Sequence, residues 1–298
     1  IVNPNSGSHA QFEALRAALD TRDETVCWET TDAGHAAELA ARAVRDGYEM
    51  VAAAGGDGTI NEVVNGILGA GGDVVLAVIP LGTGNDLARL LGVADDPADA
   101  VALLRVGEVV RIDAFRVEAG ERTVFGINAA TGGFSGQVDE VLTAELKTSW
   151  GPLAYLIGAA SVLPDLQNYE TYLVCDDGPE VKIDALNIIV ANGRTVGGGR
   201  RVSPASDPPD GWLDVVLVRT GNVVELGEVA ARLMTGNYLN SPKVLHRRAR
   251  RVRVASQPGM WFNVDGELLT KEPVVFEIML GALRVVVGSA FQPDPELK

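Results

Sequence analysis

Residues 50–68, MVAAAGGDGTINEVVNGIL, decide the fold of this chain. Residues 50–54 are apolar without polar alternation, which is typical of a strand buried on both faces of a parallel sheet. The glycine turn at residues 55–59 leads into residues 60–68, which are apolar at helical spacing. Such a turn forms an anion site, because glycines let backbone N–H groups approach a phosphate and the helix dipole favours its charge. The alternative interpretation is a generic turn with Thr59 as helix N-cap.

Two further turns are expected to line the same crevice. Val74–Ile79 is a second buried strand, followed by PLGTGND at Pro80–Asp86, and NPNSG at Asn3–Gly7 ends the first apparent strand. Loops at the carboxyl ends of neighbouring parallel strands face one crevice, so the sequence predicts one pocket formed by three main-chain turns. It contains no GxxxxGK[ST] motif and no GxGxxG after a strand, which disfavours a Walker-type site and a dehydrogenase.

Asp57 lies inside the first glycine turn. A carboxylate beside bound phosphate is costly unless a divalent cation lies between the two. Asp57 is therefore a candidate Mg²⁺ ligand or a member of a catalytic network.

The pattern of apolar residues divides the chain into two parts. Helices and short buried strands alternate through the first third, which is typical of a doubly wound α/β domain. Short strands dominate from about residue 109 and indicate a β-sandwich. We predict a Rossmann-like nucleotide-binding domain over residues 1–113 and an all-β sandwich over residues 114–298, whose last residues pack back on the first domain. The expected strands of the second part are Val109–Val117, Thr171–Cys175, Ala185–Ala191, Leu213–Val218, Val252–Ala255, Val274–Met279 and Leu283–Val287, with helices near Leu153–Leu163 and Val223–Met234.

The composition excludes several classes of function. The 298 residues include 25 Lys and Arg against 40 Asp and Glu, a formal net charge of −15. This charge repels a phosphate backbone, so no nucleic-acid partner is expected. Two cysteines are too few for a disulfide framework or a structural zinc site. The longest uncharged stretch, residues 148–164, is shorter than a membrane-spanning helix requires, and no signal-peptide pattern opens the chain, so we expect a cytoplasmic protein.

These motifs resemble the diacylglycerol kinase catalytic-domain family, in its bacterial soluble lipid kinase branch. The turn GGDGT alone is shared with NAD kinases and, loosely, with phosphofructokinases. The lipid kinases are distinguished by the combination of the turns already described with motifs that follow along most of the chain. Those motifs are TTDAGHA at 30–36, GGF at 132–134, GPLAY at 151–155, PASDPPDGWLD at 204–214, SPKV at 241–244 and NVDGE at 263–267.

The resemblance implies an Mg²⁺- and ATP-dependent kinase that phosphorylates the hydroxyl of a membrane lipid, with diacylglycerol as the leading substrate. It implies Glu267 as the general base, and Asp57 with Asp86 as the acidic network around the γ-phosphate and metal. Relatives of this kind also suggest a homodimer. The implied ATP contacts are Asn3, Pro4, Asn5, Ser6, Gly7, Thr30, Gly55, Gly56, Asp57, Gly58, Thr59, Ile60, Asn61 and Thr83.

The resemblance also implies a second, largely structural Mg²⁺ in the second part. A backbone carbonyl, an Asp and another carbonyl hold it in the family, at positions that match Asp207, Asp210 and Trp212. Asp207 stands where the resemblance implies a basic residue, and Pro208-Pro209 stiffens the loop. Because the first contact is made by the main chain, the added carboxylate is compatible with a metal.

Several of these residues also have a purely structural interpretation. Asp265-Gly266 is a hairpin-turn signal that would place Glu267 on a solvated strand. The basic run His246–Arg251, extended by Arg253, is typical of an edge strand whose arginines pair with local carboxylates. Its functional interpretation is transient peripheral docking to anionic lipid headgroups. The helix near residues 153–163 is either a core helix or the wall of an acyl-chain crevice.

Three other functions stay open at this point. One is a kinase for a different lipid, such as a sphingoid base, a ceramide-like lipid or phosphatidylglycerol. Another is an NAD kinase, and the third is a non-catalytic nucleotide- or lipid-binding regulator with the same fold. The presence of Asp57, Asp86 and Glu267 argues against the regulator.

Overall fold

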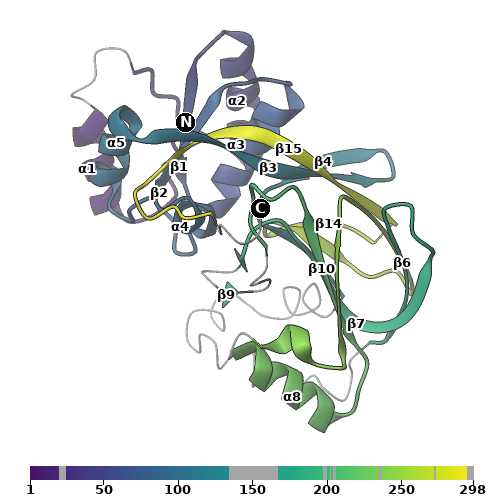
Figure 1. Cartoon of the computed structure of the whole chain (residues 1–298). Helices are drawn as coiled ribbons and strands as arrows, with labels where there is room; N and C mark the ends of the chain where they lie inside the picture. The colour runs from purple at the N-terminus through teal and green to yellow at the C-terminus, as the bar shows by residue number, and fades with distance from the viewer. Residues whose placement is uncertain are drawn as a thin grey trace.

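The computed structural model describes residues 1–19, 25–133, 167–196, 200–201, 203, 206–234, 237–271 and 273–293. The chain forms two lobes, the N-terminal one purple to blue and the second mostly green and yellow (Figure 1). The helix expected near Leu153–Leu163 lies outside the described residues. Within the described ranges, none of the helices is long and apolar enough to cross a bilayer.

The first lobe is an α/β layer around a short parallel sheet. Strands β1 (Met50–Gly55) and β2 (Val75–Pro80) pair in parallel, and Val2 bridges in parallel to Ala54 and Glu29. The N-terminal residues therefore extend the same sheet. The helices of this lobe are α1 (His9–Leu19), α2 (His35–Arg45), α3 (Asp57–Gly69), α4 (Asp86–Leu90) and α5 (Pro97–Val106).

Helices cover both faces of this sheet, because alternate side chains of β2 enter two separate cores. Val75 and Ala77 pack with residues of α5. Leu76 and Val78 belong to the larger core, to which α3 contributes four side chains that are at most 2% exposed. Those four are Ile60, Val63, Val64 and Ile67. The helical spacing of these residues on α3 is what the sequence pattern required.

The second lobe is a β-sandwich that shares hydrogen-bonded strands with the first. Phe115, Phe262 and Phe276 form its aromatic centre, with ring centroids 5.8–6.3 Å apart. An α/β lobe followed by a β-sandwich confirms the predicted fold class. The strands are β3 (Glu108–Ala119), β4 (Arg122–Gly126), β5 (Ala129–Gly133), β6 (Tyr169–Cys175), β7 (Val181–Ala191), β8 (Thr195–Val196), β9 (Arg200–Arg201), β10 (Leu213–Arg219), β11 (Val244–Ala249), β12 (Arg251–Gln257), β13 (Phe262–Val264), β14 (Glu267–Thr270) and β15 (Val274–Val287), with helix α8 (Val223–Met234) and a 3₁₀ turn at Tyr238–Asn240.

Strand β15 joins the lobes and corrects one prediction. The sequence suggested two strands, at residues 274–279 and 283–287, but the structure has one that pairs with β3 along its length and with β2 near its end. The pairing register shifts between Met279 and Leu283, where Gly281 has φ +55°. The prediction was wrong because a bulge interrupts the apolar alternation without interrupting the strand.

The hairpin β13–β14 is fastened to the preceding chain by one carboxylate. Asp265 (φ +46°) and Gly266 (φ +96°) form its two-residue turn, which the sequence signalled. The Asp265 carboxylate accepts three backbone N–H bonds, of 2.6, 3.0 and 2.9 Å, from Ile127, Asn128 and Ala129. Burial raises the pKa of Asp265 to about 6, while these amides favour the ionised form. These bonds fix the position of the turn, and hence of the backbone of Glu267, which follows the turn directly.

Replacing Gly66 by alanine should destabilise the first lobe. A Cβ at Gly66 would lie 2.3 Å from the backbone oxygen of Ala37, so α2 and α3 would have to move apart. We expect the free energy of unfolding to fall by at least about 2 kcal/mol in urea denaturation. Gly69→Ala, in the same helix and with its nearest neighbour 4.0 Å away, should be neutral or stabilising by up to about 1 kcal/mol. Equal effects of the two changes would contradict close packing at Gly66.

Asp265→Asn should cost about 2–3 kcal/mol of unfolding free energy, because both carboxylate oxygens accept amide protons and an Asn NH₂ would face one of them. Asp176→Asn is the matched control. Asp176 also has a positive φ, +51°, but the two backbone bonds described for it, from Arg250 and Arg251, use a single oxygen. Asn can keep both, so we expect a change within about 0.5 kcal/mol. Thermal and urea unfolding of the two variants measure the difference.

Candidate functional site

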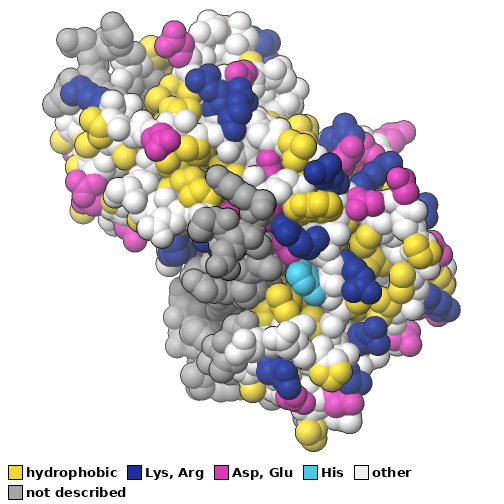
Figure 2. All heavy atoms as spheres, in the orientation of Figure 1, with side chains coloured by type: hydrophobic (Ala, Val, Ile, Leu, Met, Phe, Trp, Pro, Cys, Tyr) yellow, Lys and Arg dark blue, Asp and Glu magenta, His cyan; other side chains and the backbone are white. Residues whose placement is uncertain are grey.

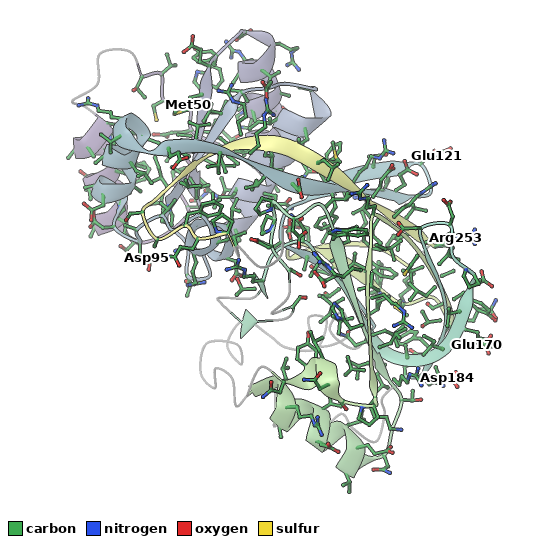
Figure 3. All side chains as sticks on the ribbon, in the orientation of Figure 1. Met50, Asp95, Glu121, Glu170, Asp184 and Arg253 are labelled. Atoms are coloured by element: carbon green, nitrogen blue, oxygen red, sulfur yellow. The ribbon has the colours of Figure 1, made fainter. Side chains whose placement is uncertain are left out.

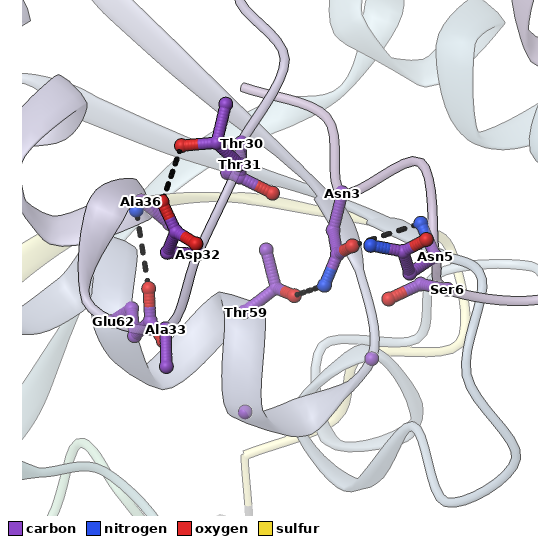
Figure 4. A pocket seen from close by; sticks show the side chains of 12 residues that line it. Asn3, Asn5, Ser6, Thr30, Thr31, Asp32, Ala33, Ala36, Thr59 and Glu62 are labelled. Atoms are coloured by element: carbon purple, nitrogen blue, oxygen red, sulfur yellow. Dashed lines mark hydrogen bonds between the residues drawn. The ribbon is translucent and has the colours of Figure 1, made fainter.

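Three turns meet at the carboxyl ends of β1 and β2, as Figure 4 shows for two of them. Asn3, in the first turn, donates from Nδ2 to Oγ1 of Thr59 at 3.0 Å. The turn after β2 touches the turn after β1, since a Cβ on Gly82 would lie 2.7 Å from Cα of Gly56. Gly7 approaches Leu81 in the same way, with a Cβ 2.5 Å from its backbone oxygen. The turns therefore meet main chain against main chain at Gly7, Gly56 and Gly82.

The start of α3 leaves backbone donors available for an anion. Gly56 is the N-cap residue, and no side chain caps the helix. The sequence-based alternative of Thr59 as N-cap is wrong, because Thr59 lies in the first helical turn and its hydroxyl accepts from Asn3. N–H groups of a first helical turn have no intrahelical acceptor, and the helix dipole adds partial positive charge there. The turn at residues 55–59 is thus equipped to hold a phosphate group.

A cavity of about 390 Å³ opens beside these turns. Its lining is polar, and most of it comes from the first turn, the start of α3 and the segment before α2 (Figure 4). The lining residues are Asn3, Asn5, Ser6, Thr30, Thr31, Asp32, Ala33, Ala36, Gly56, Gly58, Thr59 and Glu62. A cavity of this volume matches a small-molecule ligand.

The predicted nucleotide contacts divide into two groups. Asn3, Asn5, Ser6, Thr30, Gly56, Gly58 and Thr59 line the cavity, whereas Pro4, Gly7, Gly55, Asp57, Ile60, Asn61 and Thr83 do not. Ile60 is 2% and Asn61 9% exposed, so both are part of the packing of α3. Gly55 is required for a different reason, because a Cβ there would lie 2.5 Å from that of Thr59. Gly55, Ile60 and Asn61 thus support the turn at residues 55–59 from behind, and other residues of that turn line the cavity.

Glu62 is a lining residue that the sequence did not indicate. Its two carboxylate oxygens accept from the backbone N–H groups of Gly34, at 2.8 Å, and Ala36, at 3.1 Å. It therefore caps α2 from α3 and holds the cavity wall at residues 30–33 in place. The sequence offers only an indirect indication of this contact. Gly34 has no side chain to cap α2, so the first N–H groups of that helix need an acceptor from elsewhere, but the sequence does not identify it.

Asp57 and Asp86 form an acidic pair at the rim of the turns. Asp57 accepts from the backbone N–H of Asp86 through Oδ1 at 2.8 Å, which links α3 to α4. Burial raises the pKa of the Asp57 carboxyl, and the neighbouring charge of Asp86 raises it further. Neighbouring carboxylates repel each other, and a cation beside them relieves this repulsion. Arg89 reaches Asp86 at 3.5 Å.

Glu267 approaches the same turns from the second lobe. It begins β14, directly after the turn that Asp265 anchors, and it is exposed. A Cβ built on Gly58 would lie 3.6 Å from Oε1 of Glu267, so this carboxylate faces the first turn of α3. The structure therefore brings Glu267 to the turns that carry Asp57 and Asp86, although Glu267 follows both of them by more than 180 residues in sequence. Asp265, which positions Glu267, was seen in the sequence only as part of a turn.

The loop expected to hold a structural Mg²⁺ makes several contacts within the protein at the predicted positions. Oδ1 of Asp210 accepts from the backbone N–H of Trp212 at 2.9 Å, and Oδ2 pairs with the guanidinium of Arg248. The backbone oxygen of Asp207 accepts from the N–H of Asp210 at 2.9 Å. Burial raises the pKa of Asp210 to about 6, and Arg248 opposes this shift. Groups of the protein itself thus contact the Asp210 carboxylate and the Asp207 carbonyl, two of the three predicted donors, and the metal site at Asp207, Asp210 and Trp212 stays a prediction.

The basic run lies on β11, the following turn and β12 rather than on one strand. β11 pairs with β10 alone among the described strands, so it is an edge strand, and Arg248 pairs with Asp210. Arg253, at the rim of the second lobe in Figure 3, lies 3.6 Å from Glu180. Basic and acidic side chains are interspersed on this lobe in Figure 2, which agrees with the structural interpretation of the run.

The chain is similar to proteins of a known family over most of its length. Residues 1–117 match the family described as diacylglycerol kinase catalytic domain, and residues 128–287 match the YegS C-terminal NAD kinase beta sandwich-like domain. A protein named diacylglycerol kinase from Staphylococcus carnosus is 32% identical over 93% of this chain and 90% of its own length. One of the same name from Staphylococcus saprophyticus is 32% identical over 92% and 89%.

Solved structures share the fold. The crystal structure of a candidate diacylglycerol kinase from Bacillus anthracis matches with a TM-score of 0.83 and 22% identity, over 98% of this chain and 95% of that one. The two family matches follow each other along the chain in the order of its two lobes. Together with relatives 32% identical across nine-tenths of the sequence, they show that this chain belongs to the diacylglycerol kinase family.

Proposed function

We propose that this lipid kinase transfers the γ-phosphate of ATP to the free hydroxyl of diacylglycerol, giving phosphatidic acid. One observation carries the proposal. Bare main-chain turns after β1 and β2 lie beside Asp57, Asp86 and Glu267, three carboxylates from both lobes. Phosphoryl transfer requires this combination of phosphate positioning, charge neutralisation and a base for the attacking hydroxyl.

The polar cavity supplies the nucleotide site. The N–H groups at the start of α3 bind the phosphates, and the cavity wall at residues 30–33 accommodates the rest of the nucleotide. Mg²⁺ bound with the phosphates would neutralise part of their charge. Asp57 and Asp86 are the residues that would hold it, because burial raises the pKa of Asp57, the charge of Asp86 raises it further, and a divalent cation beside the two carboxylates would offset both effects.

Glu267 is the proposed general base. Its carboxylate is exposed and faces Gly58, at the helix end that binds the phosphates. A lipid hydroxyl between the two would lose its proton to Glu267 as it attacks the γ-phosphorus. Asp265 keeps Glu267 there through its three backbone bonds, and is therefore a positioning residue.

The relatives named diacylglycerol kinase support the choice of diacylglycerol. Since such a lipid resides in a bilayer, we also propose transient peripheral contact with the membrane. The proposal is tested with labelled ATP and mixed micelles that contain diacylglycerol, a sphingoid base, ceramide or phosphatidylglycerol, with NAD⁺ as a further acceptor. Transfer to diacylglycerol above the other acceptors supports it, and transfer to none of the lipids contradicts it.

Glu267→Gln should lower kcat for lipid phosphorylation about 10²- to 10⁴-fold, because the base is lost, while the KM for ATP changes little. Glu121→Gln serves as control. Glu121 is an exposed carboxylate at the outer edge of the second lobe, away from the turns (Figure 3), and its replacement should leave kcat unchanged. If Glu267→Gln turned over lipid as fast as the parent enzyme, Glu267 would not be the base.

Gly56→Ala should reduce kcat/KM for ATP by about 100-fold without loss of stability. A Cβ at Gly56 meets only ordinary contact within the protein, 3.5 Å from Gly82, but it would occupy the space where a phosphate approaches the main chain. Gly227→Ala, in exposed α8 with no neighbour within 4 Å, is the control and should not alter kcat/KM. Steady-state kinetics at varied ATP, with unfolding curves for both variants, separate binding from folding. An unchanged KM in Gly56→Ala would place the phosphates elsewhere.

A further inference from the structure

The loop at residues 206–212, between the short strands β8–β9 and the start of β10, is closed by hydrogen bonds of the protein itself. The N–H of Asp210 donates to the backbone oxygen of Asp207 at 2.9 Å, which completes a turn. Asp113, on β3, donates from its N–H to the oxygen of Pro208 at 2.8 Å and accepts from the N–H of Gly211 at 2.8 Å. The polar main-chain groups of this turn are therefore joined to one another and to β3.

Three buried carboxylates belong to this loop and the strand that follows it. The side chains of Asp207, Asp210 and Asp214 are 4%, 1% and 0% exposed. Buried carboxylates require compensating partners, and here the protein supplies them. Arg194 lies 3.0 Å from Asp207, Arg248 pairs with Asp210, and Nε2 of His246 lies 2.5 Å from Asp214.

Arg248 occupies the position beside Asp210 that a divalent cation would need. Its guanidinium donates to Oδ2 of Asp210 and also lies over the Trp212 ring, 5.7 Å from the centroid. Arg250 lies over the same ring at 4.9 Å. A cation bound to Oδ2 of Asp210 would have to displace the Arg248 guanidinium and tolerate the positive charge of Arg250, which stacks on the neighbouring Trp212 ring. A guanidinium is permanently charged and suits a carboxylate, so it fills this role without a metal.

We propose that Arg248 takes the place of a divalent cation at the loop of residues 206–212, so that the order of this loop does not depend on Mg²⁺. The divalent requirement of the enzyme is then confined to the nucleotide. This inference concerns the protein without ATP or lipid, so its test is independent of the proposed kinase reaction.

The test measures unfolding and Mg²⁺ binding of the full chain without nucleotide. Any shift of the parent's unfolding midpoint between EDTA and 10 mM Mg²⁺ should be matched within about 1 °C by Asp210→Asn, so that this loop contributes nothing to it. Arg248→Gln leaves Asp210 buried without its cation, so its midpoint in EDTA should fall by roughly 5–10 °C. Mg²⁺ should then restore a large part of that loss, because the vacated position beside the carboxylate accepts a metal.

Arg250→Gln is the matched control. Arg250 stacks on the same indole, but the guanidinium that contacts the Asp210 carboxylate is that of Arg248. It should show a small shift in EDTA and no recovery with Mg²⁺. Should Arg248→Gln fail to fold, calorimetric titration of the parent with Mg²⁺ alone, beside Asp210→Asn, still decides the question. The proposal predicts that Asp210→Asn binds Mg²⁺ as the parent does, because the loop contributes no binding site in the parent.

Two results would overturn the proposal. One is stabilisation of the parent by Mg²⁺, or Mg²⁺ binding to the parent, that is lost in Asp210→Asn, since the loop would then hold a cation despite Arg248. The other is a folded Arg248→Gln protein that gains nothing from Mg²⁺, since Arg248 would then not stand in the position of a metal.

Discussion

The approach of one stretch of bare main chain to another is the constraint on which the rest of this structure depends. Gly56 and Gly82 come so close that a single methyl group at Gly82 would meet the backbone of Gly56. That proximity exists because β1 and β2 are parallel neighbours and both turns leave the same edge. The edge can therefore present backbone N–H groups rather than side chains to a ligand, and the carboxylates around it supply the charge that glycine cannot.

The acidic groups at this edge come from different elements and are held by backbone donors. Asp57 is oriented by the N–H of Asp86, and Glu267 is placed by the three amides that bind Asp265. The Asp57 carboxylate, which the bond from Asp86 orients, loses little conformational freedom when a ligand arrives. The second lobe thus contributes to the site through a hairpin whose position is set by a buried contact with the chain that enters β5.

The turns of the candidate site could be predicted from the sequence, because the residues within a turn largely determine its conformation. The strand–turn–helix pattern at residues 50–68 predicted both β1 and α3, and the two other turns followed from the same reasoning. Contacts between residues that are far apart in the sequence could not be predicted. Nothing local to Glu62 indicates that it caps α2, and nothing near Asp210 indicates Arg248 as its partner. The bulge in β15 was missed for the opposite reason, because a local break in apolar alternation suggested an end that tertiary pairing overrides.

Strand β15 also determines whether the two lobes can exist apart. Residues at its end lie next to β2 in the sheet of the first lobe, while its beginning pairs with β12 of the sandwich. A truncation after residue 113 would strip the α/β lobe of the strand beside β2 and leave that edge, with its apolar neighbours, open to solvent. The α/β lobe therefore cannot be moved by itself into another protein. A fusion of this lobe to a different lipid-binding domain would have to include strand β15.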